Sequence, residues 1–132
     1  MSRSLPRSLV AALTAGAAFG LAAGSAAADA KAPCFFVSQW RGWKAPDANT
    51  LYLRVNMKDI YRADLSAGSQ QLTWGGSYHL VSRVEGSSSV CGPLDLQLAV
   101  SDGRGFKQPL IVRDLVKLTP DEIAALPKKD LP

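Results

Sequence analysis

The sequence has little of what metal and redox centres are made from. It contains one histidine, His79, and two cysteines, Cys34 and Cys91. A structural zinc site takes four Cys or His ligands, and a redox dithiol takes closely spaced cysteines such as C-x-x-C. Neither arrangement can be assembled from these three residues. We therefore predict no metal site, no redox dithiol and no cofactor.

Signatures of hydrolytic enzymes are missing as well. No Gly-x-Ser-x-Gly elbow accompanies His79, which argues against a Ser-His-Asp triad. The aspartates of the chain lack the spacing of a calcium-binding loop; they include Asp59, Asp64, Asp95 and Asp102. These absences favour a protein that is not an enzyme, and we assign no catalytic residue.

Long apolar runs are absent except at the N-terminus. Arg3 and Arg7 precede an uncharged, mostly apolar stretch at residues 9–23, and small residues follow it. This order is typical of a secretory signal peptide, with cleavage before Asp29 or before Lys31. The apolar stretch is shorter than the roughly 20 residues that span a membrane. A retained N-terminal anchor is the alternative, and the short stretch with its good cleavage site disfavours it.

Cleavage after residue 28 leaves a single small β-domain, residues 29–132. We expect its core at about 34–127 and a frayed tail at 128–132. Loss of the two arginines in the signal peptide lowers the surplus of Lys and Arg over Asp and Glu from 4 to 2. So small a surplus argues against nucleic-acid binding. No second apolar run of spanning length follows, so we expect an exported chain, periplasmic or secreted, without a transmembrane segment.

Export also bears on the two cysteines. In an oxidising compartment an even number of cysteines indicates a disulfide, and only one intramolecular pairing is available here, Cys34 with Cys91. Two free thiols, or a bridge between two chains, remain the alternatives.

Alternation of apolar and polar residues predicts most of the strands. Leu51, Leu53, Val55 and Met57 alternate with polar or larger neighbours, and a similar pattern continues at residues 60–65, so the two segments form an antiparallel hairpin. The clearest alternation is that of residues 94–100, and a turn at 101–105 follows. The predicted strands cover residues 35–40, 50–57, 60–65, 78–84, 94–100 and 110–118.

The C-terminal part of the chain has helix signals instead. Thr119 is a good N-cap, Pro120 suits the first helical position, and Glu122 completes a capping box. Pro127 ends the helix. Pro109 lacks an amide donor, so the strand at 110–118 should begin at an edge or a bulge. Together these elements predict an all-β fold, a small antiparallel barrel or sandwich of about six short strands with one short C-terminal helix.

Several short segments, in their order along the chain, resemble a family of small exported bacterial proteins catalogued as domain of unknown function 6491. The segments are Cys-Phe-Phe-Val at 34–37, Leu-Tyr-Leu-Arg-Val at 51–55, Asp-Ile-Tyr-Arg-Ala-Asp-Leu at 59–65, Ser-Ser-Val-Cys at 88–91 and the stretch from Val-Arg-Asp-Leu at 112–115 to Leu126. The resemblance covers residues 34–127 and brings no reaction, ligand or catalytic residue with it.

The resemblance does bear on the cysteines. Members of that family often carry four, and the first and third correspond to Cys34 and Cys91. The other two would fall near Gln70 and Gln108, where this chain has none. Joint loss of two cysteines implies that they formed one pair, which leaves Cys34 paired with Cys91.

The most distinctive local feature lies at residues 40–44. Trp40 and Trp43 alternate with Arg41 and Lys44, and such a set can stack on sugars or bases while its cations meet anionic groups. These four residues form our predicted ligand-binding patch. In the alternative interpretation the indoles cover the core and the cations are simply solvated. The same two interpretations apply to Trp74.

The sequence thus favours a non-enzymatic binding or structural module of the cell envelope, whose partner is an envelope protein or polymer. One alternative is an enzyme with a site near His79, with Arg83 and aspartates of the strands. Another is a binder of an anionic polymer through residues 40–44.

Overall fold

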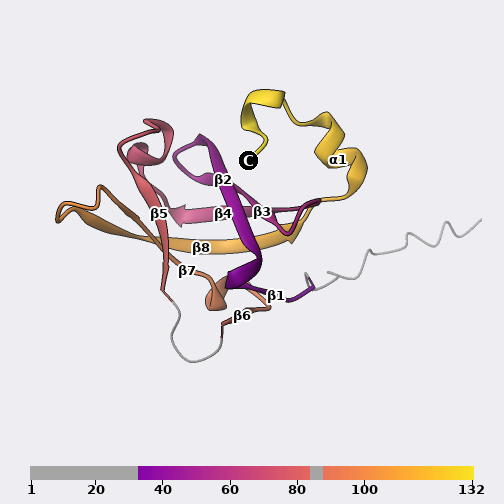
Figure 1. Cartoon of the computed structure of the whole chain (residues 1–132), viewed down its shortest axis with the longest axis horizontal. Helices are drawn as coiled ribbons and strands as arrows, with labels where there is room; N and C mark the ends of the chain where they lie inside the picture. Colours follow the sequence, from indigo (N-terminus) through magenta and orange to yellow (C-terminus); the bar gives the residue numbers. More distant parts are fainter. Residues whose placement is uncertain (1–32, 84–87) are drawn as a thin grey trace, which may run out of the picture.

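The computed structural model describes residues 33–83 and 88–132. The predicted signal peptide and its cleavage sites lie outside these residues. The described chain is mainly β, with one short α-helix and several 3-10 turns (Figure 1). The strands are β1 (Phe35–Phe36), β2 (Trp40–Asp47), β3 (Thr50–Val55), β4 (Asp59–Ala67), β5 (His79–Arg83), β6 (Ser89–Val90), β7 (Gln97–Ser101) and β8 (Lys107–Lys117); the helix is α1 (Pro120–Ala125).

Six strands form one antiparallel sheet in the order β2-β3-β4-β8-β7-β5, and β1 pairs with β6 in a small second sheet. The large sheet curls into a half-barrel, so that its two edge strands, β2 and β5, pass in front of β4 and β8 (Figure 1). The predicted antiparallel β-fold is therefore confirmed.

Alternating side chains of the curled sheet fill one hydrophobic core. In β3 the inward residues Leu51, Leu53 and Val55 are almost fully buried, and in β4 Tyr61, Ala63 and Leu65 are their counterparts. The hairpin of β3 and β4 is thus confirmed. The inward residues of β3 end at Val55 and do not continue to Met57, because Asn56 adopts a positive φ of 55° and turns the chain. Met57 lies in the turn, 84% exposed, and its prediction as a core residue is wrong.

Two other predicted strands have different bounds. The segment 35–40 is not one strand: β1 ends at Phe36, a 3-10 turn (Val37–Gln39) follows, and β2 begins at Trp40. The side chain of Gln39 accepts a hydrogen bond from the Phe36 amide (2.8 Å), which holds this turn. The strand predicted from residue 94 begins only at Gln97. Pro93 opens a 3-10 turn (Pro93–Asp95), and Leu94 is 88% exposed instead of buried.

Strand β8 begins earlier than predicted and includes Pro109, which lies opposite Ala99 of β7. On its other side β8 pairs with β4 only as far as Ile111, the partner of Ala67. Pro109 therefore lies in the part of β8 that is paired with β7 but no longer with β4. A residue without an amide donor is tolerated at such a local edge.

The C-terminal helix has the predicted cap. The Glu122 amide donates to the Thr119 hydroxyl (3.2 Å), and the Glu122 carboxylate accepts from the Thr119 amide (2.7 Å). The tail at 128–132, however, is not frayed. It forms a 3-10 turn (Lys128–Asp130) and returns to β2 and β3, where Arg54 Nε donates to the Pro132 oxygen (2.7 Å; Figure 1).

Cys34 and Cys91 form the predicted disulfide, which links the residue before β1 to the residue after β6. Beside it, the Phe35 and Tyr61 rings lie 4.7 Å apart, and the Tyr61 hydroxyl donates to the Pro33 oxygen (2.9 Å). Burial raises the pKa of this hydroxyl. The disulfide thus links the two strands of the β1–β6 sheet, and the contact between Phe35 and Tyr61 attaches this sheet to β4 of the large sheet.

Candidate functional site

The predicted patch at residues 40–44 lies on β2, at one edge of the half-barrel. Trp40 is opposite Val55 and Trp43 is opposite Leu53, with a bulge between Trp40 and Gly42. Cross-strand neighbours share a face of the sheet, so both indoles point to the inner face, where they pack against the core. An extra residue in a bulge explains how side chains three positions apart come to share a face.

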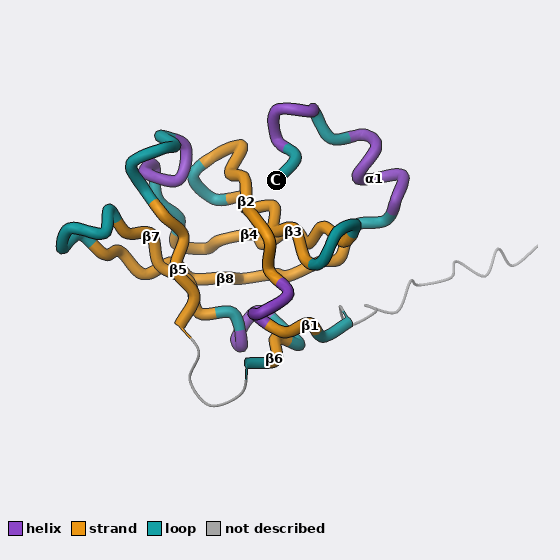
Figure 2. Tube along the Cα trace, viewed as in Figure 1, coloured by secondary structure: helices purple, strands orange, loops and turns teal. Residues whose placement is uncertain are grey.

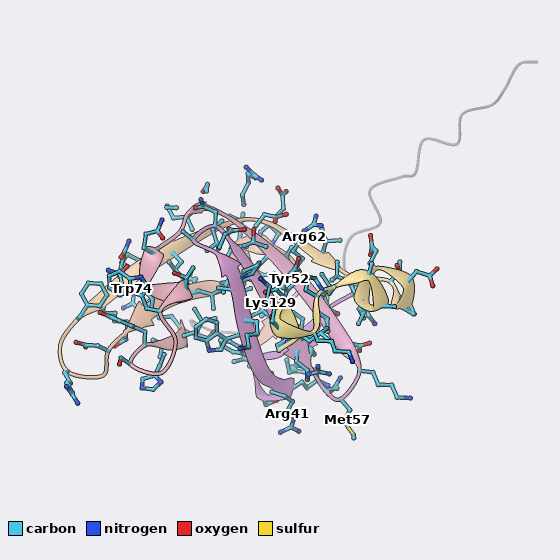
Figure 3. The ribbon with its side chains drawn as sticks, turned by 90° about the horizontal axis from the view of Figure 1, so that it is seen from above. Arg41, Tyr52, Met57, Arg62, Trp74 and Lys129 are labelled. Atoms are coloured by element: carbon cyan, nitrogen blue, oxygen red, sulfur yellow. A yellow bond between two sulfur atoms is a disulfide. The ribbon has the colours of Figure 1, made fainter. Side chains whose placement is uncertain are left out.

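The two cations of the patch are separated from each other. Lys44 is opposite Tyr52 and therefore lies on the outer face. Arg41, at the bulge, is exposed and points away from the body of the molecule (Figure 3). Trp40, Arg41 and Trp43 line a shallow hollow of about 220 Å³ together with Leu80 of β5. The structure thus gathers three of the four predicted residues at the gap between the two edge strands and leaves Lys44 on the other side.

A second and more polar hollow lies at one end of the sheet. Its volume is about 350 Å³. We call it the loop-end site; its lining residues are Gly76, Ser77, Tyr78, His79, Asp102 and Arg104. The loop before β5 and the loop after β7 meet there because His79 is paired with Ser101 (Figure 2). Gly76 and Gly103 have φ values of 67° and 70°, a conformation that glycine adopts without a steric penalty.

Three aromatic rings form a row beside the loop-end site. The Tyr78 ring centroid is 6.0 Å from that of Trp74 and 6.0 Å from that of Phe106, both edge to face. Trp74 is 63% exposed and Phe106 is 39% exposed, and Figure 3 shows Trp74 at the periphery of the molecule. Large exposed rings at the border of a polar hollow are typical of ligand contacts rather than of core packing.

Asp102 holds the second loop in place. Its Oδ1 accepts hydrogen bonds from the amides of Arg104 (2.8 Å) and Phe106 (3.0 Å). Chiefly the Arg104 amide holds the pKa of the Asp102 carboxyl below its usual range. The Ser101 hydroxyl adds a bond to the Phe106 oxygen (2.9 Å). The carboxylate therefore stays ionised while it fixes the backbone that carries Arg104 and Phe106.

The alternative site near His79 is only partly assembled. Arg83 lies at the other end of β5 and does not line the loop-end site. Asp64 forms an ion pair with Arg62 (3.2 Å), and Asp95 accepts a hydrogen bond from the Cys91 amide (3.0 Å). Both aspartates, Asp64 in β4 and Asp95 in a 3-10 turn, are thus used locally, and the described carboxylate that does share a hollow with His79 is Asp102, from a turn.

Within residues 33–83 and 88–132, no three His, Cys, Asp or Glu side chains gather as metal ligands would. None of the helices in this part of the chain is long and apolar enough to cross a membrane. No known protein family, curated protein or solved structure matches the chain. A functional assignment must therefore come from the geometry of its sites.

Proposed function

We propose that the protein is an exported, non-enzymatic binding module of the cell envelope, and that it binds its ligand at the loop-end site. The row formed by Trp74, Tyr78 and Phe106 beside a hollow with His79 and Arg104 carries this proposal. Two loops held on paired strands present these side chains, which is how rigid scaffolds commonly display binding residues.

A saccharide is the class of ligand that fits best. A sugar ring has one apolar C–H face, which can lie on an exposed aromatic ring, and an edge of hydroxyl groups. At the loop-end site the exposed Trp74 and Phe106 rings offer such surfaces, while His79, Asp102 and Arg104 offer hydrogen-bond donors and acceptors. The polymers of a cell envelope include many saccharides, which agrees with the proposed location.

Export, to the periplasm or beyond the cell, is supported by two features. The N-terminal sequence has the order of a signal peptide, and the Cys34–Cys91 disulfide needs an oxidising compartment to persist. Membership of the family of domain of unknown function 6491 remains part of the proposal. It rests on the order of short segments across residues 34–127.

Titration calorimetry with soluble oligosaccharides tests the proposal. The probes are oligomers of β-1,4-linked glucose, of N-acetylglucosamine and of galacturonate. We expect one of them to bind the wild type, and Trp74→Ala to weaken that binding about ten-fold because a stacking surface is lost. Phe36, 52% exposed on β1, gives a matched control: Phe36→Ala removes an exposed ring elsewhere and should bind normally. Equal binding by both variants, or binding of none of the probes, would contradict the proposal.

A second candidate is an enzyme centred on His79. It is favoured by one observation: His79 and Asp102 line the same hollow. Against it, the backbone hydrogen bonds that lower the pKa of Asp102 make this carboxyl a poor general acid near neutral pH. Slow hydrolysis of the bound oligosaccharide by wild type, abolished in His79→Gln, would favour the enzyme. Unchanged oligosaccharide after prolonged incubation would favour the binding module.

A further inference from the structure

The outer face of β5, β7 and β8 has an ordered arrangement of side chains. Strand pairing places Val81, Ala99 and Pro109 in one apolar row across the three strands. On one side of this row lies Lys107 of β8, and on the other lies Arg83 of β5. The outer face is therefore apolar along its middle and has a cation on either side.

Two adjacent hollows lie along these strands and share lining residues, and we call them together the outer groove. Core residues such as Leu98 line them as well as residues of the outer face. The first, of about 220 Å³, is lined by Arg83, Leu98, Ala99, Lys107 and Pro109. The second has a similar volume, shares Arg83, Leu98 and Pro109 with the first, and continues over residues that are apolar except for Gln97. Its further lining residues are Pro93, Leu94, Leu96, Gln97, Leu110, Ile111 and Val112.

Among the described residues, the charged side chains that line the outer groove have one sign. They are Arg83 and Lys107, and neither takes part in an ion pair within the described part of the chain. In the second hollow, which Arg83 also lines, Leu94 is 88% exposed and Ile111 is 59% exposed. Unpaired cations next to exposed aliphatic side chains match a molecule with an anionic head and an apolar tail.

We infer that the outer groove binds a single-chain carboxylate amphiphile of the fatty-acid type. The carboxylate lies between Arg83 and Lys107, where it accepts charge-assisted hydrogen bonds. The alkyl chain lies over Pro109 and reaches Ile111 and Leu94, which it shields from water. This groove is separate from the loop-end site, so its ligand does not depend on the proposed saccharide.

Calorimetric titration with sodium dodecanoate, below its critical micelle concentration, tests this inference. We expect saturable binding of one molecule per chain, weakened about ten-fold or more in Arg83→Gln/Lys107→Gln because two charge-assisted hydrogen bonds are lost. Ile111→Asp should weaken binding too, since it replaces an apolar contact of the alkyl chain with a charged group that the chain would have to strip of water. Lys58→Gln/Lys128→Gln removes two exposed cations outside the groove and should bind as the wild type does.

Two further ligands complete the test. Dodecyltrimethylammonium has the same tail with a cationic head, and we expect it not to bind. Binding of both amphiphiles with equal affinity would overturn the inference, because the cations would then contribute nothing. Binding to vesicles of anionic phospholipid without binding of dodecanoate would also overturn it, in favour of a membrane surface. Circular dichroism spectra of every variant verify that the compared proteins are folded.

Discussion

Arg41 and Trp43 are two residues apart on β2, yet their surroundings differ. The Trp43 indole packs against the core, and the Arg41 side chain extends into solvent (Figure 3). A partly buried indole contributes apolar area and dispersion contacts to stability, whereas a solvated guanidinium contributes little. The alternative interpretation of the predicted patch, in which its indoles cover the core, therefore describes Trp43 well.

We expect Trp43→Ala to lower the free energy of unfolding by about 2 kcal/mol, since truncation removes packing over the core. Arg41→Gln should change it by less than about 0.5 kcal/mol, as is usual for exposed positions. Urea denaturation followed by circular dichroism measures both. If the two variants were equally stable, Trp43 would not be a core-covering residue, and the binding patch would regain its support.

The sequence alone singles out His79 of the loop-end site and Trp74 beside it, but it does not show that the two loops of the site come together. The turn after β7 is evident from its glycines. Nothing local in the sequence shows that Phe106 reaches the Tyr78 ring, since this contact depends on the pairing of His79 with Ser101. The register between β5 and β7 is a long-range property, and it decides which loops share a site.

Among the elements, strand alternation was informative wherever one face of the strand is buried. It located β3 and β4 because their inward residues contact the core in every second position. It failed at Leu94, where the same spacing continues backward into a 3-10 turn that starts at Pro93. A period of two shows which residues can share a face, but the ends of a strand depend on turns and on neighbouring strands.

A polar contact joins the segment after β4 to strand β8. The Ser69 hydroxyl, in a residue only 5% exposed, lies within hydrogen-bond distance of the side-chain oxygens of Gln71 and of Gln108 (3.0 Å for Gln108), and its single hydrogen is donated to one of them at a time. The Gln108 amide donates to the Gly68 oxygen (3.4 Å). The resemblance implies two further family cysteines near residues 70 and 108, and in this chain hydrogen bonds connect those regions.

We expect Gln108→Ala to lower the free energy of unfolding by about 1 kcal/mol, because the buried Ser69 hydroxyl and the Gly68 carbonyl lose a partner. Gln70→Ala removes an exposed glutamine nearby and is the matched control. Denaturation curves of the two variants test the contact. A Gln108→Ala protein as stable as the control would mean that water replaces the glutamine without loss.

Considered as a whole, the molecule has its loop-end site and its disulfide in different regions. The loops that form the site lie beyond one end of β5, and β6 with Cys91 comes after the other end of β5 in the sequence. The curled sheet lies between them. Its edge strands, β2 and β5, are not paired with each other, so the sheet stays open. The disulfide beside β1 and β6 therefore restricts a chain that a closed barrel would otherwise hold together.

This arrangement predicts separate effects on stability and on binding. The disulfide closes a loop with a sequence separation of 57, for which chain entropy gives roughly 4 kcal/mol and typical measured values are about 2–4 kcal/mol. Cys34→Ser/Cys91→Ser should lose that much stability in urea denaturation. Its folded fraction should still bind the loop-end ligand with wild-type affinity at low temperature, since β5, β7 and their loops do not contain the disulfide.

Reductant is the control for this prediction. It should destabilise the wild type by the same amount and leave the stability of the double variant unchanged, which separates the effect of the bond from the effect of the two serines. A double variant as stable as the wild type would show instead that the packing of Phe35 and Val90 alone holds the β1–β6 sheet in place.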